Sequence, residues 1–243
     1  MGIAVEIAVQ DLAGVRVALA EGADRVELCS ALGMGGLTPS AALISAAVAE
    51  ARAQGRDRFV QVLVRPRGGG FLYDADELAL TLGDVRFARE AGAAGVVVGA
   101  LTEDGGVDTE ALERIVAEAG PLQVTFHRAL DAAEHPLDAA GVLVQLGVTR
   151  VLSSGGTARS IDGIHLLRAL SERFSGQLEV MAGGGVRVVD IPALARAGVD
   201  AVHLSARDTV RGTPSGPGGG DAAYDITDPA TVRAALAAAS LIR

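Results

Sequence analysis

The chain has 243 residues, 49% of them hydrophobic and 21% charged, a composition that supports one large globular core. Its formal net charge of −9 disfavours binding to nucleic acids and to anionic membranes. The single cysteine, Cys29, excludes an intrachain disulfide and fits a reducing compartment.

Strand-like and helix-like segments alternate along the whole chain. The segments that predict strands are 3–9, 25–29, 59–64, 95–100, 122–128, 150–154, 178–182 and 201–205. The segments that predict helices are 11–21, 40–53, 74–91, 109–119, 136–146, 160–174, 189–197 and 229–242. Glycine ends several helices before the next strand, as at Gly22 and Gly198. The repeat predicts an α/β fold, a (β/α)8 TIM barrel forming a single domain over residues 1–243.

An open doubly wound sheet is the alternative architecture. Such a sheet more often carries a glycine-rich turn after its first strand, where this chain has Gln10-Asp11 and no G-x-G-x-x-G motif, so we expect no NAD. All 21 basic residues are arginine. Because a Schiff base needs a side-chain amine, the absence of lysine excludes a lysine-dependent aldolase and a pyridoxal-phosphate enzyme.

The one low-complexity stretch is 207–225, which contains GTPSGPGGGD. It lies between the last predicted strand and the last predicted helix, so we expect a long Gly/Pro-rich loop that is a lid or is disordered. The N-terminus has no basic, apolar leader, and no apolar run approaches the roughly 20 residues that span a bilayer, so we expect a cytoplasmic protein without a membrane partner.

Polar residues recur toward the carboxyl ends of the predicted strands, the face where TIM barrels carry their sites. Alternate side chains of a barrel strand point inward. The predicted inward set is Glu6, Ala8, Arg25, Glu27, Cys29, Gln61, Leu63, Arg65, Gln123, Thr125, His127, His203 and Ser205. Two interpretations stay open, a functional site or a buried ion-pair network in which Glu6 and Glu27 neutralise the arginines.

His127 is the sharpest catalytic candidate, because a histidine at a strand end can act as a general acid, a general base or a metal ligand. Glu27 and Asp131 are its candidate partners. The alternative is a strand histidine whose hydrogen bonds are satisfied and whose role is structural.

Two glycine-rich segments predict anion binding. Arg65 and Arg67 frame a proline-stiffened turn that suits a carboxylate or phosphate, unless they pair with surface acids. Gly183, Gly184 and Gly185 follow the seventh predicted strand, and Ser205 ends the eighth. That is where many barrels bind phosphate through backbone N–H groups.

Metal binding is harder to predict, because the chain has no C-x-x-C, H-E-x-x-H or EF-hand pattern. Cys29, His127 and His203 could meet with Glu27, although one thiol is a poor start for a copper(I) site. A divalent ion on Glu6, Glu27 and His127 is a further hypothesis. The alternative for Cys29 is a buried small apolar residue.

Seven segments, in this order, resemble the motifs of the CutC family: EGADRVELCSALGMGGLTPS, VRPRGGGFLYDADE, GVVVGALTEDGGVD, TFHRALD, VLSSGG, VMAGGGV and VHLSA. The resemblance covers residues 3–206 and implies a cytoplasmic TIM barrel, often a homodimer, with a role in copper homeostasis through copper binding. It also implies that Cys29 of the ELC motif is a copper ligand. The family's first strand usually places a second cysteine two residues after its glutamate, where this chain has Ala8 after Glu6.

Two functional hypotheses follow. The first is a CutC-type copper homeostasis protein that binds copper. The second is a barrel enzyme, a lyase, epimerase or hydrolase, that acts on a small anionic or phosphorylated metabolite through histidine, carboxylate and arginine chemistry. In the second, Arg65 and Arg67 hold the anion while His127 transfers protons. A purely structural polar centre is the third interpretation.

Overall fold

Eight parallel strands close into a barrel in the computed structural model, which describes residues 2–213, 216–217 and 222–240. The strands are β1 (Ala4–Val9), β2 (Arg25–Leu28), β3 (Val60–Leu63), β4 (Gly95–Val98), β5 (Gln123–Phe126), β6 (Arg150–Ser153), β7 (Glu179–Gly183) and β8 (Ala201–Leu204). The barrel closes because β1 pairs with both β2 and β8. The predicted TIM barrel is confirmed.

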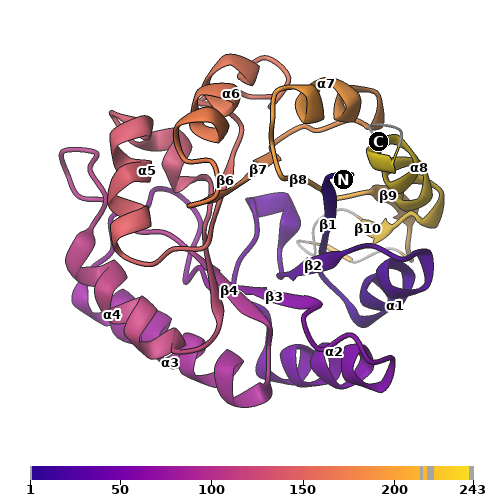
Figure 1. Ribbon diagram of the computed structural model, residues 1–243. Coiled ribbons are helices and arrows are strands. Elements are labelled where there is room, and N and C mark those ends of the chain that lie inside the picture. Colours follow the sequence, from indigo (N-terminus) through magenta and orange to yellow (C-terminus); the bar gives the residue numbers. More distant parts are fainter. Residues whose placement is uncertain (1, 214–215, 218–221, 241–243) are drawn as a thin grey trace.

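Helices surround the barrel as an outer ring (Figure 1). They are α1 (Leu12–Glu21), α2 (Ala41–Ala53), α3 (Ala75–Ala91), α4 (Thr109–Ala119), α5 (Pro136–Gln145), α6 (Ile164–Arg173), α7 (Ile191–Arg196) and α8 (Pro229–Ser240). Short 3-10 turns are η1 (Leu32–Met34), η2 (Arg128–Ala132) and η3 (Val188–Asp190). Asp74 and Glu77 form a capping box at the start of α3, and Gly22 ends α1 at φ 86°, so local sequence signals set these boundaries. In the described part of the chain, no helix is long and apolar enough to cross a membrane.

The strands separate two environments. Residues such as Val5, Ile7 and Val9 face the helices and belong to the main apolar core. The side chains between them face the barrel interior, which is polar toward its amino-terminal end. There Arg25 donates to Glu6 at 2.7 Å and to Glu179 at 2.6 Å. Arg150 donates to Glu179 at 2.8 Å, so paired charges fill this end of the barrel.

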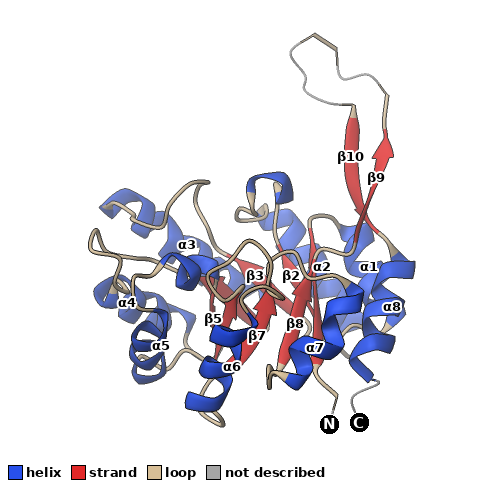
Figure 2. Ribbon diagram, turned by 90° about the horizontal axis from the view of Figure 1, so that it is seen from above, coloured by secondary structure: helices blue, strands red, loops and turns tan. Residues whose placement is uncertain are grey.

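The predicted 207–225 loop is wrong at its two ends. Arg207–Arg211 (β9) pairs antiparallel with Ala223–Thr227 (β10), and this hairpin projects from the barrel on the side away from the chain termini (Figure 2). The flanks of the segment contain Thr209, Val210, Tyr224, Ile226 and Thr227, which are β-branched or aromatic residues of the kind that favours strands. Arg207 and Asp225 also pair across the hairpin at 3.0 Å. The rest of the expected loop, 214–215 and 218–221, lies outside the described residues.

Candidate functional site at the mouth of the barrel

A cavity of about 360 Å³ opens at the carboxyl ends of the strands. Its charged and polar lining comes from strands on several sides of the barrel and from the loops that follow them. The lining comprises Ala8, Glu27, Leu32, Gly35, Leu63, Arg65, Phe71, His127, Arg128, Leu152, Gly184, Gly185, Val186, His203, Leu204, Ser205 and Arg207. The strands bring together Glu27, Arg65, His127 and His203, as the inward alternation predicts.

Three groups form a carboxylate–imidazole–carboxylate line into this cavity. His203 Nδ1 lies 2.8 Å from Glu6 Oε1, and His203 Nε2 lies 3.8 Å from Glu27 Oε2. Glu6 is fully buried, yet the hydrogen bond from His203 and the charge of Arg25 outweigh that burial and lower its pKa to about 2. Glu6 therefore holds the orientation of His203, with both carboxylate oxygens occupied.

Glu27 has no such support. Burial raises the pKa of its carboxyl to about 7. The charge of His203 lowers this pKa and the charge of Glu6 raises it, and both effects are smaller than that of burial. Although burial disfavours its charged form, the carboxylates of Glu27 and Glu6 raise the pKa of His203. No described group donates a hydrogen bond to the Glu27 carboxylate. This carboxyl can therefore gain or lose a proton near neutral pH, which is what a general acid or base requires.

His127 follows β5 and differs from His203 in charge. Its Nδ1 accepts the backbone N–H of Ala129 at 3.2 Å, and Phe71 packs on the ring with centroids 4.9 Å apart. Burial and then the charge of Arg65 lower the pKa of His127 to about 3, so the ring is neutral. Because Nδ1 accepts, the proton belongs on Nε2, which is buried and has no partner among the described residues.

Gly99 makes room for this ring. A Cβ at position 99 would stand 2.5 Å from both His127 Cε1 and His127 Nδ1. Any side chain there would displace the imidazole, so the glycine fixes where His127 can lie.

The predicted anion-binding residues divide into two groups. Arg65 lines the cavity, and its Nη atoms donate to the carbonyls of Met34, Gly35, Gly36 and Gly69. Its Nε is buried without a partner among the described residues, so Arg65 contributes its charge and this one free N–H. Arg67 lies outside the lining and pairs with Glu77 of α3. Gly184, Gly185 and Ser205 line the cavity, whereas Gly183 is the last residue of β7 and does not.

Asp131, a predicted partner of His127, makes other contacts. It accepts the backbone N–H groups of Ser154 at 2.9 Å and Gly156 at 3.1 Å and pairs with Arg128 at 2.9 Å. Arg128 itself lines the cavity. The structure therefore places Asp131 as a support for the β6 loop and for Arg128, with no described hydrogen bond to His127.

The model of the CutC family matches residues 3–208 of this chain. A CutC family protein of Klebsiella pneumoniae is 44% identical over 83% of this chain and 79% of its own length. The copper homeostasis protein cutC homolog of Homo sapiens is 39% identical over 86% of this chain and 75% of its own. This chain belongs to the CutC family. The crystal structure of CutC from Streptococcus agalactiae agrees, with a TM-score of 0.78 at 32% identity over 84% of this chain and 98% of that one.

The CutC match spans every residue that lines the cavity, since these run from Ala8 to Arg207. The fit of this CutC chain to copper is poor. Cys29 is fully buried beside Leu63 and Val97, its thiol donates to the carbonyl of Val9 at 3.4 Å, and it does not line the cavity. Burial, and then the charge of Glu27, raises the pKa of this thiol, whereas a copper ligand must be a thiolate.

The other sulfur and imidazole groups do not supply the missing ligands. Ala8 stands where the family resemblance implies a second thiol, and the sulfur of Met181 accepts from Arg25 at 3.3 Å. Within the described ranges, no three histidine, cysteine or acidic side chains are grouped to hold a metal ion. The residues present therefore do not fit a thiolate copper(I) site.

The cavity residues that sequence reasoning missed include an aromatic ring and two arginines, Phe71, Arg128 and Arg207. Arg128 directly follows His127, so the sequence indicates a polar end to this strand, but it does not indicate the direction of the Arg128 side chain. Arg207 stands at the start of β9, in the segment expected to be a loop. Its place became clear only with the pairing of the hairpin.

Proposed function

We propose that this chain binds a small anionic metabolite at the mouth of its barrel and carries out acid–base chemistry on it. The observation that carries the proposal is Glu27, a buried carboxyl with a pKa of about 7 and no described hydrogen-bond donor, which faces a cavity of metabolite size. A carboxyl with only a structural role normally accepts close hydrogen bonds, as Glu6 does at 2.7 Å and Glu179 at 2.8 Å, whereas the only described partner of Glu27, His203 Nε2, lies 3.8 Å away.

The charges around the cavity support an anionic ligand. Arg65, Arg128 and Arg207 bring positive charge to the lining, while Glu27 is the one acidic residue among the described residues that line it. The acids that pair with Arg128 and Arg207, Asp131 and Asp225, are not part of the lining. This concentration of positive charge occurs in a protein of net charge −9, so it selects an anion at one place on the molecule. Gly184 and Gly185 add backbone that a ligand can approach closely.

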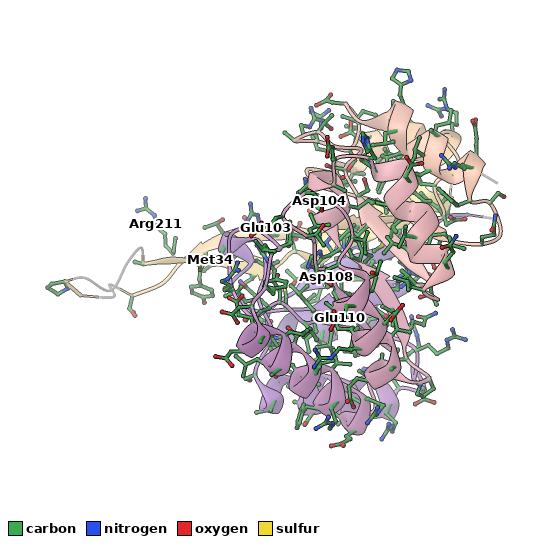
Figure 3. All side chains as sticks on the ribbon, turned by 90° about the vertical axis from the view of Figure 1, so that its left-hand side faces the viewer. Met34, Glu103, Asp104, Asp108, Glu110 and Arg211 are labelled. Atoms are coloured by element: carbon green, nitrogen blue, oxygen red, sulfur yellow. The ribbon has the colours of Figure 1, made fainter. Side chains whose placement is uncertain are left out.

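The hairpin offers a matched pair of variants to test anion binding. Arg207 lines the cavity, whereas Arg211 is exposed on the same strand and lies out on the hairpin, away from the barrel (Figure 3). We expect Arg207→Gln to weaken binding of inorganic phosphate or pyruvate about fivefold, the effect of losing about 1 kcal/mol of charge attraction. Arg211→Gln should leave it unchanged.

Calorimetric titration, supported by thermal shift, measures both effects. If neither anion binds the wild-type protein, or if the two variants weaken binding equally, the barrel mouth is not the anion site and the proposal is wrong.

We further propose that the chain contributes to copper homeostasis, as the name of the human relative states for that protein. The contribution would come through the ligand of the barrel mouth, because the residues do not fit a thiolate copper site. Titration with copper(I) of the wild-type protein and of Cys29→Ser should give the same stoichiometry and affinity. Loss of a bound copper ion in Cys29→Ser would contradict this and restore Cys29 as a ligand.

A further inference from the structure

Two buried groups face each other across the mouth of the barrel. Glu27 belongs to β2 and His127 follows β5, three strands away in the closed order of eight. Both residues line the same cavity; His127 Nε2 has no hydrogen-bond partner among the described residues, and the nearest cationic group to Glu27, His203 Nε2, stays 3.8 Å from Oε2, beyond hydrogen-bond distance. A small ligand in the cavity would therefore lie between a carboxyl and an imidazole N–H.

His127 is built to donate a hydrogen bond. The backbone N–H of Ala129 occupies Nδ1 and fixes the tautomer with the proton on Nε2. Phe71 and the bare Gly99 hold the ring in place. A fixed neutral N–H that lacks a described protein partner, on a residue that lines a cavity, suits an oxygen that gains negative charge during a reaction, such as a carbonyl oxygen.

Glu27 is built to move a proton. It has no described hydrogen-bond donor, and its neighbour His203 is held by Glu6 at 2.8 Å, so the carboxyl is free toward the ligand. The chain has no lysine, so a carbonyl compound must be activated here without a Schiff base. Polarisation of the carbonyl by a hydrogen bond is the route that these residues offer.

We propose that the barrel mouth catalyses proton abstraction from the carbon next to a carbonyl group, with Glu27 as the base and His127 as the donor to the carbonyl oxygen. The substrate class is a small phosphorylated ketose, aldose or keto acid, and the inference rests on the proposed anion site. The reaction class is isomerisation or epimerisation, which narrows the enzyme hypothesis drawn from the sequence.

The step balances without a co-reactant. The Glu27 carboxylate takes the proton from carbon, and the C–H electron pair becomes the new C=C bond. The C=O electron pair moves to oxygen, which His127 Nε2–H stabilises as an enediolate. Return of the proton from Glu27 to the neighbouring carbon, while the hydroxyl proton of that carbon passes through His127 Nε2 to the former carbonyl oxygen, gives an isomer. Protonation of the first carbon by water from the opposite face, with the Glu27 proton released to solvent, gives an epimer.

The phosphate end has its own positioning groups. Arg128 is held by Asp131 at 2.9 Å and by the Ser154 hydroxyl at 3.0 Å, beside Gly184. A Cβ at position 184 would stand 3.0 Å from the Arg128 guanidinium carbon, so glycine there leaves the guanidinium accessible to the cavity. Arg207 approaches from the hairpin. Arg128 begins η2 after β5, Gly184 follows β7 and Arg207 begins β9 after β8, whereas Glu27 belongs to β2.

Exchange of C–H for deuterium in D2O, followed by proton NMR, tests the inference. The probes are dihydroxyacetone phosphate, ribulose 5-phosphate and pyruvate, the last without phosphate. We expect the wild-type protein to exchange the C–H next to the carbonyl of a phosphorylated probe, and to exchange pyruvate more slowly. Glu27→Gln and His127→Gln should each lower the exchange rate at least 100-fold. Glu103→Gln, an exposed residue outside the cavity, should match the wild type.

Circular dichroism confirms that each variant is folded, and the matched preparation of Glu103→Gln controls for traces of host isomerases. Exchange that persists in both Glu27→Gln and His127→Gln would overturn the inference. Anion binding without exchange would overturn it while the proposed function stands, and so would release of inorganic phosphate without exchange. Absence of both binding and exchange would overturn the two together.

Discussion

Replacement of Glu27 by glutamine should change the pH dependence of stability in a direction that the burial of this carboxyl determines. The pKa is about 7 in the folded protein and 4.5 in the absence of the fold. Between those values the folded state binds more protons than the unfolded state, so the stabilising contribution of Glu27 is present below pH 4.5 and is lost as pH rises through 7. Integrated from pH 5 to pH 8, the loss is about 2.5 kcal/mol.

Urea denaturation at pH 5 and pH 8 measures this change. Relative to Glu27→Gln, the wild-type protein should be more stable at pH 5 than at pH 8 by about 2.5 kcal/mol, because glutamine does not titrate. The comparison cancels the titrating groups that do not interact with Glu27, and the difference that remains belongs to Glu27 together with His203, whose pKa the Glu27 carboxylate raises. Glu103→Gln, on the surface between β4 and α4, should show no such difference. A difference below about 0.5 kcal/mol would refute the claim that burial raises this pKa.

Two further substitutions test the supports of the site by the same measurement. Gly99→Ala places a Cβ 2.5 Å from the His127 ring and should lower the free energy of unfolding by about 1–3 kcal/mol. The control, Gly83→Ala in α3, places a Cβ with nothing within 4 Å and should raise that free energy by up to about 1 kcal/mol. Equal effects would contradict the role given to Gly99. Arg150→Met removes one of the two guanidinium groups that pair with Glu179, while Arg25 stays at 2.6 Å, and should cost about 1.5–3 kcal/mol. A neutral result would show that this charge network does not stabilise the barrel.

The barrel was predictable because its signals are local and repeated. Buried parallel strands read as short apolar runs, and glycines such as Gly22 end the helices before them. The inward alternation then placed Glu27, His127 and His203 together, since side-chain direction in a strand follows from parity alone. Strand ends differ by one or two residues, and His127 lies just after β5.

The contacts of flexible or loop residues were not predictable in the same way. Arg67 sits on the predicted turn, but its long side chain reaches Glu77 at the start of α3. Asp131 is close to His127 along the chain, yet backbone N–H groups of the β6 loop compete for its oxygens. These contacts depend on where several loops meet in space. Amino-acid composition and hydrophobic periodicity carry no information about that arrangement.

Because of the position of the hairpin, we expect the residues that transfer protons and a residue that sets anion affinity to lie on different parts of this protein. Glu27, His127 and His203 lie on or beside barrel strands, well inside the span that matches the CutC family, residues 3–208. Arg207 stands at the edge of that span, and most of the hairpin that holds it lies beyond. Changes in the hairpin should therefore alter how tightly an anion binds, because they move a peripheral charge, while the proton transfer by Glu27 depends on a barrel that the hairpin does not build.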